Sequence, residues 1–262
     1  MKDSWQPAWF REGRQPAFIS EIPFVPFGTV KFLWGNMPAL DILRLNDDAG
    51  EMKEQELALL FAASGDLRNV VTTLAHIPDN SDASLRVTIN DKEFAIVARN
   101  TIMLLTALLF DVVIAVPMII HLWYSAALPH SMVDALRTKV LPMIQDVCDK
   151  IQDKPGRSMQ AKEFAFGATK LRVVLTKDEW YRLVRYFTLP DTITLEKSRQ
   201  IRRRITLAPE KVDYRERAML QWPPGRRMVD MHFREEGILL PYGCSSAAFD
   251  KPNPWVLLSC DI

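Results

Sequence analysis

Cysteine is scarce in this sequence of 262 residues, which contains only Cys148, Cys244 and Cys260. An odd number of widely spaced cysteines does not indicate a disulfide framework, and the four histidines are too scattered to complete a Cys/His zinc spacing. The amino terminus, MKDSWQPAWF, is aromatic and polar, so we expect no signal peptide there. These absences favour a reducing cytosol or nucleus over a secretory compartment, and no structural metal; we expect a cytoplasmic protein.

An excess of charge is also lacking, because the formal net charge is only +1 and gives no overall field that favours nucleic acid or membrane. One apolar run, TIMLLTALLFDVVIAVPMII at 101–120, reaches the length of a membrane span. Asp111 at its centre would cost about 2.5–3.5 kcal/mol in a bilayer, and Pro117 is expected to interrupt a helix. We predict two buried core helices that meet near Asp111, and no membrane partner.

The ends of the chain differ from its middle. Residues 1–35 combine prolines with large aromatic side chains, which block regular helix and usually cover an apolar surface. We therefore predict an extended arm over 1–35 that packs on the core. An α/β domain is expected over 36–190, beginning with an acidic stretch at 41–56 that predicts a short helix and a solvated loop. A helical extension, with short helices separated by prolines, is expected over 191–262.

From residue 57 onwards, strand-like and helix-like segments alternate. The runs LALLFAA at 57–63 and LRVTI at 85–89 predict strands, whereas LRNVVTTLAHI at 67–77 and the apolar stretch at 92–109 predict helices. A strand, helix, strand, helix order predicts parallel pairing with helices on the faces of the sheet. The fold class is therefore α/β, with a Rossmann-like, methyltransferase-like parallel sheet.

Local signals place several helix boundaries. Asn90 followed by Glu93 predicts a reciprocal cap at the start of the second helix, near Asp91. Further along, LRVVLT at 171–176 predicts another strand, after which Thr176 and Glu179 form a second capping box. Two apolar helix faces are expected, one made by Leu67, Val70, Val71 and Leu74 and the other by Trp180, Leu183, Val184 and Phe187.

The polar turn in FAASGDLRNVV, residues 61–71, is the candidate cofactor site. In a dinucleotide or S-adenosylmethionine site, glycine lets the backbone approach the ligand, and an acid after the second strand receives the ribose hydroxyls. This chain places Gly65 after the first strand and Asp91 after the second, in the required order. The candidate cofactor-binding residues are Ser64, Gly65, Asp66 and Asp91.

The glycine fingerprint of such sites is absent from the same turn. A G-x-G-x-x-G motif would need two more glycines, but Ala63, Leu67 and Arg68 occupy the neighbourhood. Ser64 and Asp66 are explained as caps of the following helix, and Asp91 as a first-turn acid favoured by the helix dipole. We therefore favour a structural turn without a cofactor, and expect S-adenosylmethionine only under the alternative interpretation.

A basic cluster marks the carboxyl-terminal part and consists of Lys197, Arg199, Arg202, Arg203 and Arg204, followed by Arg215, Arg217, Arg226 and Arg227. Such a patch is suited to phosphates or to an acidic partner. No stacking aromatics interleave the arginines, as single-strand binding would prefer. A solvated helical surface, balanced by the acidic residues at 41–56, is the favoured interpretation, and the nucleic-acid signal is weak.

No catalytic constellation is evident. Ser245 and Ser246 lack the flanking residues of a nucleophile elbow. Cys148 lies in an amphipathic helical context and His121 in the apolar segment MIIHLWYSA, so burial is the expected state of both. The residues alone therefore favour a non-enzymatic protein.

Four long segments resemble a known domain: FLWGNMPALDIL (32–43), LLFAASGDLRNVVTTLA (59–75), VTINDKEFAIVARNTIMLLTALL (87–109) and HLWYSAAL (121–128). Together they resemble the uncharacterised domain that opens dynein axonemal assembly factor 3 and recurs in fungal proteins, often beside a MYND-type zinc finger. The segments PAWFREGRQPAF and PFGTVKFLWGN before them, and LTKDEWYRL, ITLAPEKVDYRERAML and FREEGILLPYG after them, resemble the fungal members in particular.

The resemblance implies a Rossmann-like fold, similar in outline to S-adenosylmethionine-dependent methyltransferases, with no assigned catalytic residues. The ciliary relative preassembles axonemal dyneins in the cytoplasm, but that role does not transfer directly, because fungal members mostly belong to organisms without cilia. Three cysteines exclude an intact MYND finger, and the chain ends where longer relatives continue, as expected of a truncated or standalone form. A non-catalytic interaction or assembly factor with an unidentified protein partner is therefore expected, and a methyltransferase-like enzyme is the alternative.

Overall fold

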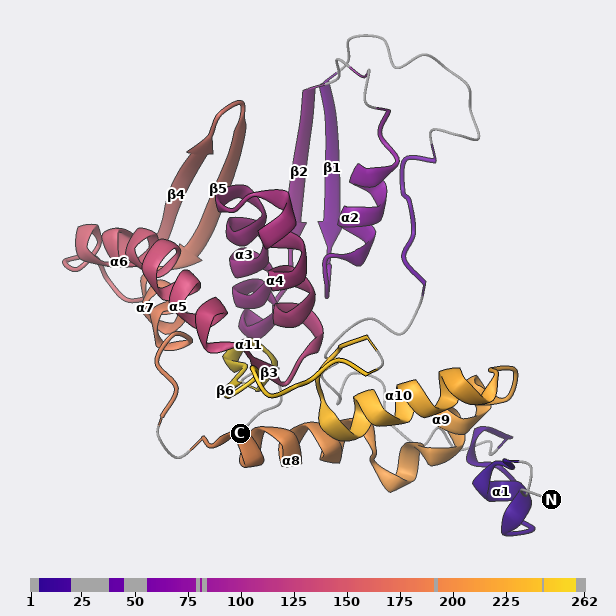
Figure 1. The fold of residues 1–262 in the computed structure, drawn as a ribbon. Helices are drawn as coiled ribbons and strands as arrows, with labels where there is room; N and C mark the ends of the chain where they lie inside the picture. Colours follow the sequence, from indigo (N-terminus) through magenta and orange to yellow (C-terminus); the bar gives the residue numbers. More distant parts are fainter. Residues whose placement is uncertain are drawn as a thin grey trace. The chain divides into compact units, whose positions relative to one another are not determined.

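The computed structural model describes residues 5–19, 38–44, 56–78, 81, 84–190, 193–241 and 243–257 (Figure 1). Most of the predicted arm, from residue 20 to 35, and the acidic loop at 45–55 lie outside these residues. The described part is a mixed α/β structure rich in helix, with three two-stranded sheets.

Two compact units divide the chain. One comprises Phe32–Ile119 and Thr138–Phe187, and we call it the α/β unit; the other comprises Met1–Lys31, Ile120–Arg137 and Thr188–Ile262, and we call it the helical unit. The helical unit thus joins the amino-terminal arm and the carboxyl-terminal extension to a segment from the middle of the chain. This division differs from the three consecutive segments expected from the sequence.

A parallel βαβ unit begins the α/β unit. Strand β1 (Glu56–Ala62) leads through α2 (Arg68–Ala75) to β2 (Ser84–Asn90), and α3 (Phe94–Leu109) follows. The two strands pair in parallel, in register from Glu56 opposite Ser84 to Ala62 opposite Asn90. The predicted order and direction of these elements are confirmed.

The sheet formed by β1 and β2 has only two strands in the described part of the chain. Burial alternates along β1: Leu60 is 63% exposed, whereas the adjacent Phe61 is 8% exposed. One face of this pair is therefore open, unlike a strand covered by helices on both faces. The described strands form no continuous Rossmann sheet.

Helix α2 buries a different face from the predicted one. Leu67, just before the helix, and Val70 are buried as expected, but Val71 is 51% and Leu74 40% exposed. Thr73 is fully buried instead, because its hydroxyl accepts a hydrogen bond of 3.1 Å from the amide of Ile42. A tertiary hydrogen bond has replaced an apolar contact on this face.

Two helices meet near Asp111, as predicted, where α3 ends and α4 (Val112–Tyr124) begins. The Asp111 carboxylate accepts a hydrogen bond of 3.0 Å from the amide of Val113 and so caps α4. Pro117 does not interrupt α4, contrary to expectation. The bond that its missing N–H cannot donate would go to Val113, which is 78% exposed in the first turn, so the disruption is small.

Helices α3 and α4 differ in how much of their surface is buried. Helix α3 is buried along most of its length, whereas α4 leaves several large apolar residues exposed, so the prediction of two buried helices is wrong for one face of α4. No helix among the described residues combines the length and the apolar character needed to cross a membrane.

The predicted cap at Asn90 and Glu93 is wrong. Helix α3 begins at Phe94, Glu93 is its N-cap residue without a side-chain cap, and Asn90 is the last residue of β2. The chain needs residues 91–93 to turn from the strand into the helix, so the reciprocal bonds of a capping box cannot form between Asn90 and Glu93.

The rest of the α/β unit comprises α6 (Leu141–Lys150), β4 (Met159–Phe166), β5 (Thr169–Thr176) and α7 (Lys177–Arg185). Strand β5 was predicted, but its antiparallel partner β4 was not. The capping box of Thr176 and Glu179 is confirmed. Trp180 and Leu183 are fully buried, Phe187 is buried and Val184 half-buried, as the predicted face requires.

Short helices dominate the helical unit. They are α1 (Ala8–Arg11), η1 (Ala17–Ile19), α5 (His130–Lys139, which runs into the α/β unit), α8 (Leu195–Thr206), η2 (Pro209–Lys211), α9 (Val212–Met219), α10 (Pro224–Glu236) and α11 (Pro254–Leu257). Prolines 209, 223 and 224 lie at helix starts, as expected for the extension. Strand β3 (Ala127–Leu128) pairs antiparallel with β6 (Lys251–Pro252).

Polar side chains hold the segment just before β3. Asn253 donates a hydrogen bond of 2.7 Å to the carbonyl of Ser125, and the hydroxyl of Ser198 donates one of 2.8 Å to the carbonyl of Ala126. Both Ser198 and Asn253 are fully buried. Residues far apart in the sequence therefore satisfy this buried backbone.

The described arm docks through Asp213 on α9. The guanidinium of Arg14 donates hydrogen bonds of 2.6 and 2.7 Å to the Asp213 carboxylate, and the amide of Ala17 donates a third of 2.7 Å. Residues 5–19 form a short helix and a 3₁₀ turn rather than a wholly extended arm. The hydrogen bonds from Arg14 hold the pKa of Asp213 below its ordinary value.

Replacing Asp213 by asparagine should release the arm, because the charged acceptor for Arg14 is lost. We expect tryptic cleavage at Arg14 to accelerate roughly fivefold, measured by mass spectrometry of timed digests. Asp230→Asn, which removes an ion pair within α10, is the control and should leave the rate unchanged. An unaltered cleavage rate in Asp213→Asn would contradict this docking. Since the pKa of Asp213 is lowered, the Asp213 carboxylate should keep its charge, and the wild-type arm should stay docked, until the pH falls below about 4.

Candidate functional site

The Gly65 turn follows the carboxyl end of β1. The amide of Ser64 donates a hydrogen bond of 3.0 Å to the carbonyl of Asn90, the last residue of β2. Gly65 has a φ of +59°, and a Cβ built there would meet no described heavy atom within 4 Å. The left-handed backbone, rather than a close neighbour in the fold, is what favours glycine at this position.

Asp91 joins the ends of the two strands. One carboxylate oxygen accepts a hydrogen bond of 2.9 Å from the amide of Gly65, and the other accepts one of 2.9 Å from the amide of Glu93. Asp91 precedes the N-cap residue of α3, so it is not the first-turn acid that was expected. In a nucleotide site this carboxylate would face ribose hydroxyls, whereas here both of its oxygens bind backbone amides.

The other predicted site residues lie in the same turn. Asp66 is buried and accepts hydrogen bonds from Arg68, one from the backbone amide at 3.2 Å and one from Nε at 2.8 Å. The structure therefore brings Ser64, Gly65, Asp66 and Asp91 together, largely through bonds that stabilise the turn.

Asn100 on α3 completes this site and was not predicted. It is 4% exposed, and its side-chain amide donates a hydrogen bond of 2.8 Å to the carbonyl of Gly65. Its Oδ1 and the hydroxyl of Ser64 are buried without a hydrogen-bond partner among the described residues. The signal that would have found Asn100 is a polar side chain within the apolar pattern of 94–109.

The basic cluster on α8 separates into inward and outward residues. Arg202 is 1% exposed and donates a hydrogen bond of 2.7 Å to the carbonyl of Tyr124, and Arg203 donates one of 2.8 Å to the carbonyl of Glu235. Lys197 and Arg204 are exposed and Arg199 is half-buried. The cluster is not one solvated surface, because Arg202 belongs to the core of the helical unit.

The following arginines lie over aromatic rings. The guanidinium carbon of Arg217 is 4.7 Å from the centre of the Phe18 ring, and that of Arg226 is 4.4 Å from the Trp222 ring. Phe18 comes from a distant segment and Trp222 lies four residues before Arg226, and both arginines are exposed.

His121 and Cys148, the remaining candidates, lie in surroundings typical of structural residues. His121 is half-buried, its Nδ1 lies 3.0 Å from the Ser125 hydroxyl, and burial lowers its pKa. Cys148 is buried, and burial raises the pKa of its thiol to about 11. Within the described ranges, no group of three or more His, Cys, Asp or Glu residues is arranged to hold a metal ion.

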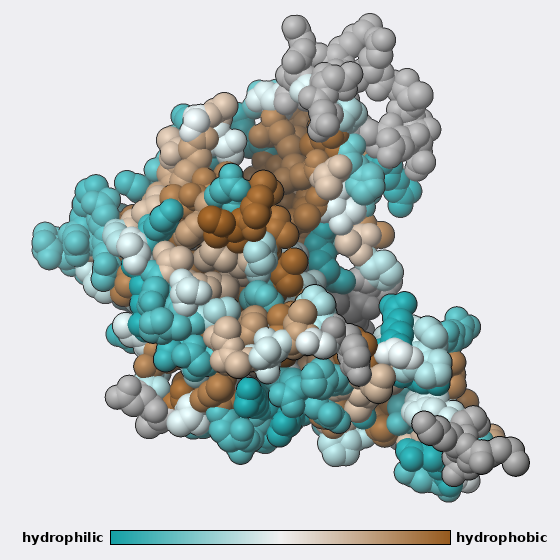
Figure 2. Space-filling model, viewed as in Figure 1, coloured by the Kyte–Doolittle hydropathy of each residue, from teal (hydrophilic) through white to brown (hydrophobic). Residues whose placement is uncertain are grey.

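An exposed apolar surface covers the first part of α4. Val112 is 68%, Val113 78%, Ile114 52% and Val116 48% exposed. Figure 2 shows apolar residues gathered over this helix. We call these four residues the α4 apolar face; sequence reasoning missed it because the whole run 112–120 is apolar and shows no polar side.

Comparison with known proteins finds a family model that covers part of the chain. Residues 33–128 match the family model of a domain of unknown function (DUF4470). No curated protein and no solved structure matches the chain. The matched segment contains the βαβ unit, the Gly65 turn, Asn100 and the α4 apolar face.

Removing the Asp91 carboxylate should destabilise the protein, because the amides of Gly65 and Glu93 lose their acceptor. We expect Asp91→Ala to lower the free energy of unfolding by about 1–3 kcal/mol, measured by urea denaturation. Asp91→Asn keeps one acceptor oxygen and should lie between Asp91→Ala and the wild type. Wild-type stability in Asp91→Ala would show that these bonds do not hold the turn.

Arg202 and Arg204 offer a matched pair of substitutions on α8. Arg202→Met should destabilise the protein by about 1–3 kcal/mol, because the carbonyl of Tyr124 loses its donor, whereas Arg204→Met should have little effect on the urea midpoint. Equal urea midpoints for the two variants would show that Arg202 contributes no more to stability than the exposed Arg204, and would contradict its role in the core. Retention on a heparin column should depend on Arg204 and not on Arg202.

Proposed function

We propose that this protein is a non-catalytic interaction or assembly factor built on a degenerate Rossmann-like unit. The observation that carries the proposal is the α4 apolar face, where four large aliphatic side chains on one helix are about half exposed or more. Clustered exposed apolar surface marks protein interaction sites, because its removal from water favours association. The partner would accordingly be a protein that presents an apolar surface.

The state of the Gly65 turn supports the same proposal. A phosphate-binding turn offers unpaired amides to its ligand, whereas the Gly65 amide donates to Asp91. The acid that would bind ribose is itself engaged by two amides. Cofactor binding at this turn would have to break bonds that the fold already uses.

Resemblance to the amino-terminal domain of dynein axonemal assembly factor 3 agrees with an assembly role in the cytoplasm. The resembling segments include the Gly65 turn, whereas the α4 apolar face lies between two of them, in the stretch 110–117, which departs from the pattern of the fungal relatives. Dynein itself is not proposed as the partner, because the resemblance is to fungal members in particular.

One observation favours the alternative, a methyltransferase-like enzyme that uses S-adenosylmethionine. The Ser64 hydroxyl and Asn100 Oδ1 are buried at the turn without a partner among the described residues, and such groups are costly unless something satisfies them. Under this alternative, Asp91 would exchange the Gly65 amide for the ribose of the cofactor.

Two experiments test the proposal. Isothermal titration with S-adenosylmethionine and with NAD should show no binding in the micromolar range, and micromolar binding of either would favour the enzyme. The double substitution Val113→Asp and Val116→Asp should leave the urea midpoint unchanged and abolish recovery of the partner by affinity purification. Met159→Asp on β4, where the methionine is 62% exposed, is the matched control and should leave recovery intact.

A further inference from the structure

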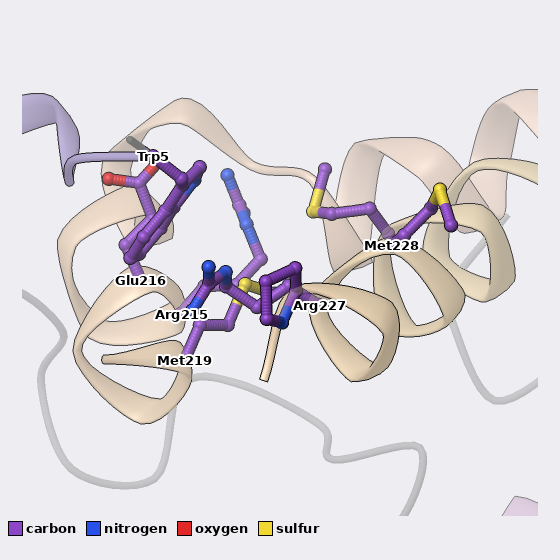
Figure 3. A pocket seen from close by; sticks show the side chains of 8 residues that line it. Trp5, Arg215, Glu216, Met219, Arg227 and Met228 are labelled. Carbon is purple, nitrogen blue, oxygen red and sulfur yellow. The ribbon is translucent and has the colours of Figure 1, made fainter. Parts of the chain in front are cut away.

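A cavity in the helical unit lies between the arm and the helices α9 and α10. Its volume is about 300 Å³, and its apolar lining comes from Trp5, Met219, Pro224, Met228 and Met231. Figure 3 shows Trp5 on one side of the cavity and Met228 on the other. Methionine side chains adapt to ligands of varied shape, so this wall suits an apolar chain.

Three charged residues complete the lining: Arg215, Arg227 and Glu216. The guanidinium of Arg227 lies 4.6 Å from the centre of the Trp5 ring and donates to the carbonyl of Trp222. The Glu216 carboxylate accepts the amide of Ala8 from the arm. Arg227 and Glu216 are thus already engaged by the walls of the cavity.

Arg215 differs from these two neighbours. Among the described residues, its Nη1 donates one long hydrogen bond, of 3.4 Å, to the carbonyl of Thr206. Its Nε is buried and has no partner among the described residues. Burial, and next the charge of Arg234, lower the Arg215 pKa, and the charges of Glu216 and Asp230 oppose this shift only in part.

The cavity size limits the ligand. A volume of about 300 Å³ corresponds to roughly ten water molecules in the liquid, and it lies at the lower end of small-molecule pockets. A methylene group is similar in volume to a water molecule, so a chain of roughly ten carbons fills the space.

We propose that this cavity binds a small amphipathic carboxylate, with its apolar chain against Trp5 and the methionines and its carboxylate accepting hydrogen bonds from Arg215. Two cations against one anion in the lining favour an acid over an amine. A carboxylate beside the Arg215 guanidinium would form charge-assisted hydrogen bonds, which are the stronger ones. This inference is independent of the proposed interaction role and of the α4 apolar face.

Decanoate and decan-1-ol are the probes, because they share a chain and differ in the charged head. Isothermal titration of the full chain should show decanoate binding, and Arg215→Met should weaken it roughly tenfold or more while changing decan-1-ol binding less than twofold. Arg217→Met on the same helix, whose guanidinium lies over Phe18 outside the cavity lining, is the matched control and should bind decanoate as the wild type does.

Trp5→Ala tests the apolar wall separately. Trp5 is 39% exposed, so its removal should leave the fold intact, and it should weaken decanoate and decan-1-ol alike. If Arg215→Met fails to fold, Trp5→Ala and the comparison of the two probes decide the matter. Absence of decanoate binding, equal affinity for the two probes, or an Arg215→Met variant that binds decanoate normally would overturn the proposal.

Discussion

The carboxylate of Asp91 holds together the part of the chain on which the α/β unit is built. It accepts the amide of Gly65 after β1 and the amide of Glu93 before α3, so one side chain links the exits of both parallel strands. Asn100 adds a bond from α3 to the carbonyl of Gly65. Hydrogen bonds from the Asp91 and Asn100 side chains to backbone groups therefore hold the turn, the strand pair and α3 in place. In a nucleotide site, the backbone amides of such a turn would face a ligand.

Helix α8 buries a charged side chain, and helix α4 exposes apolar ones, which is the reverse of the usual distribution. Arg202, within the most basic helix of the chain, is buried and satisfies the carbonyl of Tyr124. Val113, within the most apolar run, is largely exposed. One nitrogen of the buried guanidinium binds that carbonyl, and the exposed apolar face of α4 is the surface on which the proposed interaction role rests. This distribution agrees with the proposed interaction role.

Sequence patterns predicted those features of the fold that depend on residues close together in the chain. The order and parallel direction of β1, α2 and β2, the break at Asp111 and the cap at Thr176 all follow from local patterns and are confirmed. Strand β4 could have been found from the alternation in QAKEFAF and the glycine that follows it, because alternating burial and a turn residue mark a hairpin.

Features that depend on distant contacts were not predictable in this way. Thr73 is buried through Ile42, and Arg202 through Tyr124, and neither partner is indicated by the pattern around these residues. The candidate turn was located correctly from Gly65 and Asp91, but their mutual hydrogen bond was not foreseen. Spacing shows which residues can meet, whereas only the fold shows whether they bind each other or a ligand.

Hydrogen exchange of the Gly65 amide tests the central claim most directly. If Asp91 holds the turn, this N–H exchanges slowly in the wild-type protein, and saturating S-adenosylmethionine leaves its rate unchanged. A Gly65 amide that exchanges at the rate of an open loop and becomes protected when S-adenosylmethionine is added would contradict the account, because the turn would then be a ligand site.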